Sequence, residues 1–112
     1  MRIKQGEDKR YIFYTYTYGT PTPILDPPTD VVFTAKYRAK CGESFGVVKS
    51  LNNGITFDPE TGRYLMKFEP EDTINLPVGN YDFDIKIKRS NAQFFIVKQG
   101  YMTIEKSYTG VI

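Results

Sequence analysis

The side chains of this sequence that could do chemistry are carboxylates, lysines and aromatic rings, because the usual catalytic types are nearly absent. There is no histidine, and Cys41 is the single cysteine. A Cys/His metal cage, a Ser-His-Asp triad, a Cys-His pair and an internal disulfide are therefore excluded. We accordingly expect no enzyme activity and no cofactor or metal.

One pair of carboxylates falls at strand spacing. Asp82 and Asp84 are two residues apart and are followed by Lys86 and Lys88. Two acids about 7 Å apart on one strand face could bind a cation or work as a catalytic pair. Alternating acids and bases are more typical of a solvated sheet surface, and no concave pocket is indicated around them. An enzyme built on this face is the least favoured hypothesis.

A second acidic group consists of Glu69, Glu71 and Asp72. These residues lie in a turn bounded by prolines and lack the spacing of a calcium-binding loop. We interpret them as a turn with acids at the start of a short helix, where the helix dipole favours negative charge.

Four aromatic residues are candidates for a contact surface. On the expected register they lie on outward faces of the first and last strands; they are Tyr11, Phe13, Phe95 and Tyr101. Exposed aromatic rings anchor protein interfaces or stack on sugar rings. The competing interpretation is that they belong to the core, on a face whose register is misassigned. Nucleic acid is not an expected partner, because the basic residues are interleaved with acids and the net charge is only +2.

Composition predicts one soluble β-rich domain spanning residues 1–112. The chain is 40% hydrophobic and 25% charged, which suits a globular domain with its own core. Its nine tyrosines and eight phenylalanines favour strands over helices. The N-terminus has no apolar stretch typical of a signal peptide, and no segment approaches the roughly 20 apolar residues of a membrane span. We expect synthesis in the cytoplasm and no membrane association.

Period-two alternation places the strands that would position these side chains. The expected strands cover residues 11–18, 30–38, 45–51, 55–57, 63–69, 81–88 and 93–105. On the first strand we expect Ile12, Tyr14 and Tyr16 to face inward and Tyr11 and Phe13 to face outward. Gly100 predicts a bulge in the last strand. Pro70 to Thr73 offers at most one helical turn.

Seven short strands without a long helix predict an antiparallel immunoglobulin-like β-sandwich. The expected core residues are Phe33, Tyr37, Tyr64, Met66, Phe68, Phe83, Ile85 and Ile87. Tyr81 follows a turn and the apolar Leu76, the place where such folds carry a tyrosine corner. A plain core tyrosine would satisfy the same pattern.

The order of these signals resembles a known family. The resemblance rests on the opening Lys4 to Asp8, on Val31 to Arg38, on Thr61 to Phe68, on Leu76 to Ile85, and on Lys98 to Ile104. This pattern is similar to the Ig-like domain of phage and prophage tail or baseplate proteins, including the N-terminal domain of the baseplate upper protein. The proline-rich connection from Gly19 to Pro28 departs from the leucine-and-glycine step usual in that family.

The resemblance implies a non-enzymatic structural component of a virion tail or baseplate that docks on neighbouring tail proteins. Exposed sheet edges also leave room for self-association. The alternative that stays open is a carbohydrate-binding module that recognises host surface glycans through exposed tyrosines.

Overall fold

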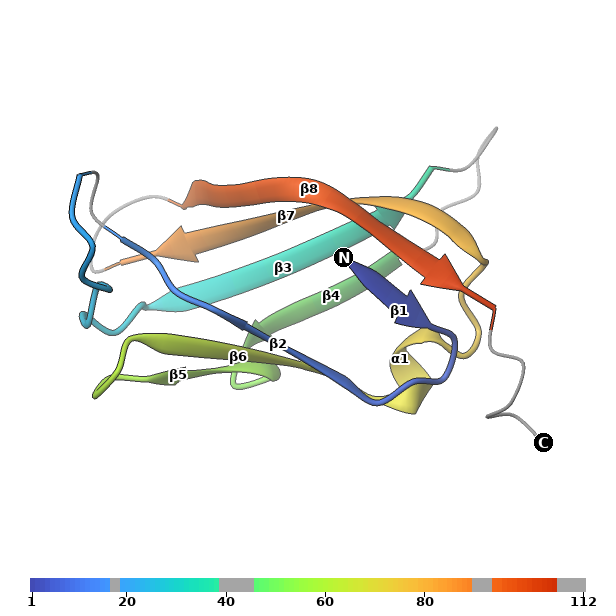
Figure 1. The fold of residues 1–112 in the computed structure, drawn as a ribbon, viewed down its shortest axis with the longest axis horizontal. Coiled ribbons are helices and arrows are strands. Elements are labelled where there is room, and N and C mark those ends of the chain that lie inside the picture. The colour runs from blue at the N-terminus through green and yellow to red at the C-terminus, as the bar shows by residue number, and fades with distance from the viewer. Residues whose placement is uncertain (17–18, 39–45, 90–93, 107–112) are drawn as a thin grey trace.

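A computed structural model describes residues 1–16, 19–38, 46–89 and 94–106, with the exception of the Phe95 side chain. Within these ranges the protein is built from strands and one helical turn (Figure 1). The strands are β1 (Arg2–Lys4), β2 (Lys9–Phe13), β3 (Asp30–Tyr37), β4 (Gly46–Leu51), β5 (Gly54–Asp58), β6 (Arg63–Phe68), β7 (Gly79–Lys88) and β8 (Phe95–Glu105). The helical turn is α1 (Pro70–Thr73). The all-β prediction is confirmed.

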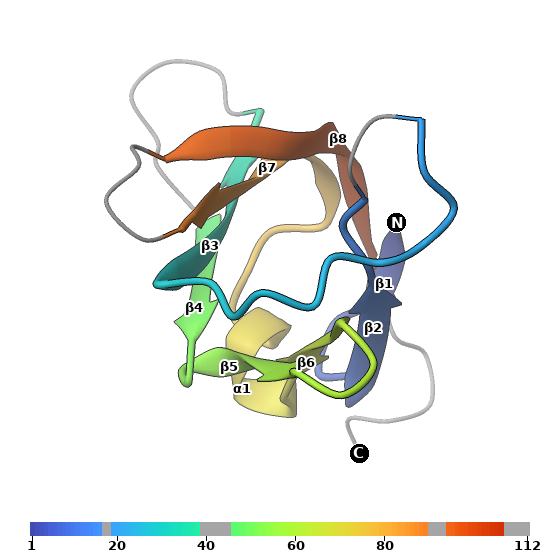
Figure 2. The same ribbon diagram turned by 90° about the vertical axis from the view of Figure 1, so that its left-hand side faces the viewer.

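All of these strands belong to one sheet, in the order β1-β8-β7-β3-β4-β5-β6-β2. The sheet curls around the interior so that its two edge strands, β1 and β2, come to lie side by side (Figures 1 and 2). The result is an eight-stranded sheet that nearly closes into a barrel, where the sequence predicted about seven strands in a sandwich.

The sheet is also mixed, whereas the prediction was antiparallel. β1 runs parallel to β8, and β4 runs parallel to β5. Between β4 and β5 the chain steps sideways at Asn52 and Gly54, which have φ values of 64° and 99°, and then continues in the same direction. β1 escaped prediction because a three-residue strand with the single apolar residue Ile3 carries no periodic signal.

The core follows from alternation along β3, β6 and β7. Every second residue on these strands is buried: Val31, Phe33, Ala35, Tyr64, Met66, Phe68, Tyr81, Phe83, Ile85 and Ile87. Aromatic rings join opposite walls of the barrel, since Phe33 on β3 contacts Phe68 on β6 edge to face at 5.7 Å and Phe83 on β7 at 5.4 Å. The expected core is confirmed, with Tyr37 only half-buried.

The expected facing of the first strand is wrong. Tyr11 and Phe13 pack against the core, whereas Ile12, Tyr14 and Tyr16 are exposed. The reason is the register with β6, in which Tyr11 lies opposite the buried Met66 and Phe13 opposite the buried Tyr64. Thr15, the next alternate residue after Phe13, is buried as well, and its hydroxyl oxygen accepts a hydrogen bond from Arg89.

The bulge in β8 lies at Val97 and not at Gly100. The register with β7 shifts between Ile85 and Lys86, so that Val97 has no opposite residue. Gly100 pairs regularly with Phe83, and a Cβ on Gly100 would lie 3.0 Å from the Phe83 ring. A side chain at this position would therefore crowd the buried Phe83 ring, which accounts for the glycine without a bulge.

The helical turn is held by its acids, as the sequence predicted. The Glu69 and Asp72 side chains form a capping box, in which the Glu69 backbone N–H donates to Asp72 Oδ2 at 2.7 Å. Asp72 Oδ2 also accepts from Lys49 Nζ at 2.5 Å. Thr73 is fully buried, and its hydroxyl oxygen accepts a hydrogen bond from the Gly6 backbone. The turn thus ties β4 and the β1–β2 connection together.

The hydrogen bond expected of a tyrosine corner is present at the start of β7. The Tyr81 ring is fully buried, and its hydroxyl group donates to the Pro77 carbonyl oxygen at 2.8 Å. Leu76 packs partly against the core. Burial raises the pKa of Tyr81 to about 12, and the nearby Tyr37 adds to this shift.

The aromatic core yields a stability prediction. Replacing Phe83→Ala removes a ring that contacts Phe33 and fills the space over Gly100, so we expect unfolding to become easier by about 3–5 kcal/mol. Lys86→Ala, on the exposed side of the same strand, should change stability by less than about 0.5 kcal/mol. Urea denaturation of both variants checks this, and equal midpoints would contradict the fold.

Tyr81 yields a pH prediction. The pKa of Tyr81 is higher in the folded than in the unfolded chain. The stability that its protonated hydroxyl group contributes is therefore complete below about pH 10 and is lost as the pH rises toward 12. At neutral pH, Tyr81→Phe should cost about 0.5–1.5 kcal/mol, because the hydroxyl bond to Pro77 disappears. Between pH 10 and 12 the wild type should lose stability faster than the variant in urea titrations; parallel losses would count against the buried hydroxyl.

Candidate interaction site

Among the described residues the sheet stays open along one line, between β2 and the part of β8 that precedes Thr103. β8 extends from Phe95 to Glu105, but β1 pairs only with its last three residues, Thr103 to Glu105. β2 is hydrogen-bonded to β6 on one side and is the sheet edge on the other. We call the resulting opening the seam: Ile12–Tyr16 on one side and Ile96–Lys98 on the other.

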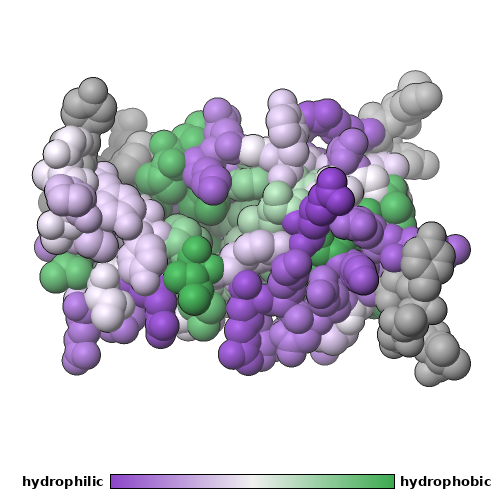
Figure 3. All heavy atoms as spheres, in the orientation of Figure 1, coloured by the Kyte–Doolittle hydropathy of each residue, from purple (hydrophilic) through white to green (hydrophobic). Residues whose placement is uncertain are grey.

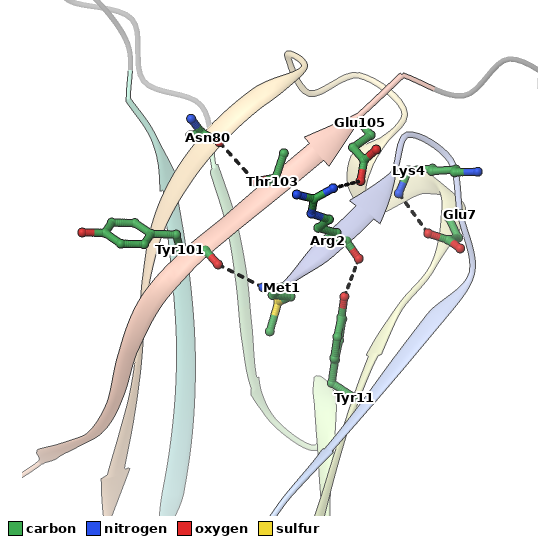
Figure 4. A network of polar contacts seen from close by, with 9 residues as sticks. All are labelled: Met1, Arg2, Lys4, Glu7, Tyr11, Asn80, Tyr101, Thr103 and Glu105. Atoms are coloured by element: carbon green, nitrogen blue, oxygen red, sulfur yellow. Dashed lines mark hydrogen bonds and ion pairs between the residues drawn. The ribbon is translucent and has the colours of Figure 1, made fainter.

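One end of the seam is closed by polar contacts around β1 (Figure 4). The Tyr11 hydroxyl group of β2 donates to the Arg2 carbonyl oxygen of β1 at 2.6 Å. Arg2 Nη1 also forms an ion pair with Glu105 Oε1 of β8 at 3.8 Å. The Met1 amine donates to the Tyr101 carbonyl oxygen at 3.3 Å. Burial, and then the charge of Glu7, raise the pKa of Tyr11. A side chain thus joins β1 and β2 here.

Beyond this closure the surface is hollowed. A hollow of about 400 Å³ is lined by Phe13 to Tyr16 and Ile96 to Lys98. A second hollow of about 80 Å³ lies nearer to Met1 and reaches the core residues Met66, Phe83 and Ile85. Phe13 and Lys98 line both hollows, so the two lie next to each other. The seam is therefore a hollowed surface whose smaller hollow is lined in part by core residues.

The rim of the seam carries exposed apolar and aromatic side chains. Their exposed fractions are 55% for Ile12, 41% for Tyr14, 51% for Tyr16 and 49% for Ile96. Figure 3 shows hydrophobic side chains gathered on this face, along β2 and at the start of β8. Exposed apolar clusters of this kind are candidates for a contact surface. The sequence showed these residues but assigned three of them to the core, because the facing of β2 depends on its pairing with β6.

The positively charged side chain of Arg89 lies beneath the Tyr14–Tyr16 end of the seam. Arg89 Nη2 donates to the hydroxyl groups of Thr15 at 3.0 Å and Tyr64 at 3.2 Å. Among the described residues Arg89 Nε is buried without a hydrogen-bond partner. The Tyr64 ring stacks on Phe13 at 4.8 Å, and burial raises the pKa of Tyr64 although Arg89 opposes the shift. These contacts hold the floor of the seam in place.

The four predicted contact residues end in different places. Phe13 lines the seam from inside, and Tyr11 braces its closed end. Tyr101 is on the outer face of β8 and is 65% exposed. The backbone of Phe95 begins β8, but its side chain lies outside the described residues. The structure therefore brings Phe13 and Tyr11 to the seam and leaves Tyr101 apart from them.

Tyr101 belongs to a separate group on the outer face. The Arg38 guanidinium lies 4.5 Å from the centre of its ring and forms a two-pronged hydrogen bond with Asp82, at 2.7 to 3.0 Å. This bond lowers the pKa of Asp82 and raises the pKa of Arg38. Asp82 is thus committed to Arg38 and is not joined to Asp84 as a carboxylate pair.

Comparison with known proteins leaves the family open. No protein-family model matches the chain, and no curated protein matches it significantly. Among the residues that the structure describes, no three potential ligand side chains gather as they would around a metal ion. No helix in the described ranges is long and apolar enough to cross a membrane.

The closed end of the seam yields a prediction. Tyr11→Phe removes the hydroxyl group that joins β2 to β1 and should lower stability by about 0.5–1.5 kcal/mol in urea denaturation. Tyr16→Phe removes a hydroxyl group from a half-exposed ring on the rim and serves as the control, with almost no expected effect. If both variants unfold at the same urea concentration as the wild type, the bond does not hold the two edges together.

Proposed function

We propose that the chain is a non-enzymatic structural component of a phage or prophage tail or baseplate, and that it docks on other tail proteins through the seam. The observation that carries the docking role is the row of exposed Ile12, Tyr14, Tyr16 and Ile96. It lies beside the edge of β2 and the part of β8 that β1 does not cover, where the described residues supply no strand neighbour. The phage assignment is supported by the sequence resemblance to tail Ig-like domains.

Protein is the partner that the seam suits best. Aromatic and aliphatic side chains that surround a groove supply the apolar centre of an interface, and charged side chains are few among its lining residues. Tyrosine combines a large contact area with a hydroxyl group that can hydrogen-bond at the rim. Tyr14 and Tyr16, whose rings are 6.5 Å apart, are the anchors that we expect to contribute most.

An immunoglobulin-like relationship is part of this proposal. The bond from Tyr81 to the Pro77 backbone, just before β7, is the feature that tyrosine corners provide in such folds. In that case β1 and the sideways step between β4 and β5 are additions that turn a sandwich into a nearly closed barrel. The protein would be made in the host cytoplasm and would end in the virion.

Glycan binding is the second candidate, and Tyr101 is the observation that favours it. Its exposed ring lies beside Arg38 and Asp82, and charged hydrogen-bonding groups next to an aromatic plane suit a sugar ring. The Arg38 guanidinium already lies over one face of the Tyr101 ring, where a sugar would have to stack. We therefore favour protein over glycan as the partner. A glycan array distinguishes the two, because Tyr101→Ala should abolish any glycan signal and leave docking through the seam unchanged.

The tail assignment is tested by electron microscopy. Particles produced by the bacterial host whose genome encodes this chain should carry it, and immunogold label against the chain should lie on their tails. Replacing both Tyr16→Ser and Ile96→Ser should remove most of the label, because these rim side chains would no longer be buried at the interface. Val48→Ser, which changes a side chain exposed to 62% on β4, is the matched control and should label like the wild type. Purified particles that lack the chain would refute the tail assignment.

A further inference from the structure

Lys98 occupies an inward-facing position of β8. It lies opposite the buried Ile85, as the buried Met102 lies opposite the buried Tyr81, so Lys98 and Met102 are on the same side of the strand. Lys98 is nevertheless exposed, because the sheet does not close over it. A charged residue therefore stands where a closed barrel would require an apolar one.

The edge of β8 beside Lys98 has backbone groups ready for pairing. The Thr103 N–H donates to the Met1 carbonyl oxygen at 2.9 Å, and the Tyr101 carbonyl oxygen accepts from the Met1 amine, so these alternate residues point their backbone groups at β1. The same alternation directs the Gln99 N–H and carbonyl toward the seam. β1 begins only opposite Thr103, and Gln99 has no strand neighbour on that side within the described part of the chain.

These two facts define what could fill the seam. An added strand would hydrogen-bond to the β8 edge and cover the hollow that leads to Met66, Phe83 and Ile85. It would also remove Lys98 from water, and an unpaired buried ammonium group is costly. No carboxylate among the described residues forms an ion pair with Lys98, so the added strand has to supply one.

We propose that the seam accepts an extended segment of a partner protein, with apolar residues at alternate inward positions and a carboxylate that pairs with Lys98. This inference rests on the proposed docking function and names the class of partner. An inward lysine at a free edge also repels strands that lack an acid, which is how edge strands avoid indiscriminate pairing. The same residue thus excludes wrong strands and selects the right one.

The test uses a designed peptide as the probe. A fluorescent nine-residue peptide, acetylated and amidated, alternates valine and threonine and carries aspartate at its central valine position. Fluorescence anisotropy should show saturable binding to the full chain. Exchanging the central aspartate for lysine should weaken binding by at least about tenfold, because two ammonium groups would then be buried together.

Three variants separate pairing at the seam from general charge attraction. Lys98→Glu should reverse the preference, so that the lysine peptide binds at least about tenfold better than the aspartate peptide. Lys36→Glu changes the net charge equally at an exposed position of β3 and should keep the preference for aspartate. Gln99→Pro should reduce binding of either peptide, because it removes the backbone N–H that would donate to the added strand. The fold should tolerate this proline, because within the described residues the Gln99 N–H makes no ladder hydrogen bond at the strand edge.

The outcomes are distinct from those of the tail experiment. No saturable binding, or binding that the Lys98 variant does not reverse, overturns the strand proposal even if the tails are labelled. A dimer that the peptide dissociates would show that a second copy of the chain fills the seam, and would also overturn it. Charge-reversible binding supports the strand proposal even if purified particles lack the chain.

Discussion

A row of aromatic rings across the barrel interior is the interaction on which the rest of the structure depends. Tyr11 on β2 contacts Phe68 on β6 edge to face at 5.9 Å, Phe68 contacts Phe33 on β3, and Phe33 contacts Phe83 on β7. The row thus links strands from opposite halves of the sheet order. Because one sheet supplies both walls of the barrel, the contacts between these rings stabilise the curled shape of the sheet around its core.

The seam exists because the two edge strands of the curled sheet, β1 and β2, do not complete the barrel. β1 is three residues long, so it covers only the last part of the eleven-residue β8, and β2 meets β1 through the Tyr11 side chain. A longer first strand would have removed both edges, as full closure does in barrels. The protein instead leaves the edges open, surrounds them with Ile12, Tyr14 and Tyr16, and places Lys98 where closure would bury it. Fold and proposed function thus meet at one structural feature.

The sequence was sufficient to predict the structural features that depend on local patterns of residues. Alternation in β3, β6 and β7 identified the core, and Pro70 with the following acids identified the helical turn. Features that depend on pairing were missed: the facing of β2, the parallel β1 and the closure into a barrel. Gly100 suggested a bulge, but its partner Phe83 explains the glycine, and the bulge lies at Val97. The seam combines two segments that are at least 80 positions apart in the sequence, from Tyr16 to Ile96, and for that reason no local pattern marked it as a site.

Amide hydrogen exchange, followed residue by residue by NMR on the free protein, shows whether the β8 edge is open beside the seam and paired with β1 beyond it. The Gln99 amide should exchange many times faster than that of Thr103, which donates to Met1, and than that of the buried Met102. Equal protection of Gln99 and Thr103 in the free protein would mean that the barrel is closed, and would contradict the account.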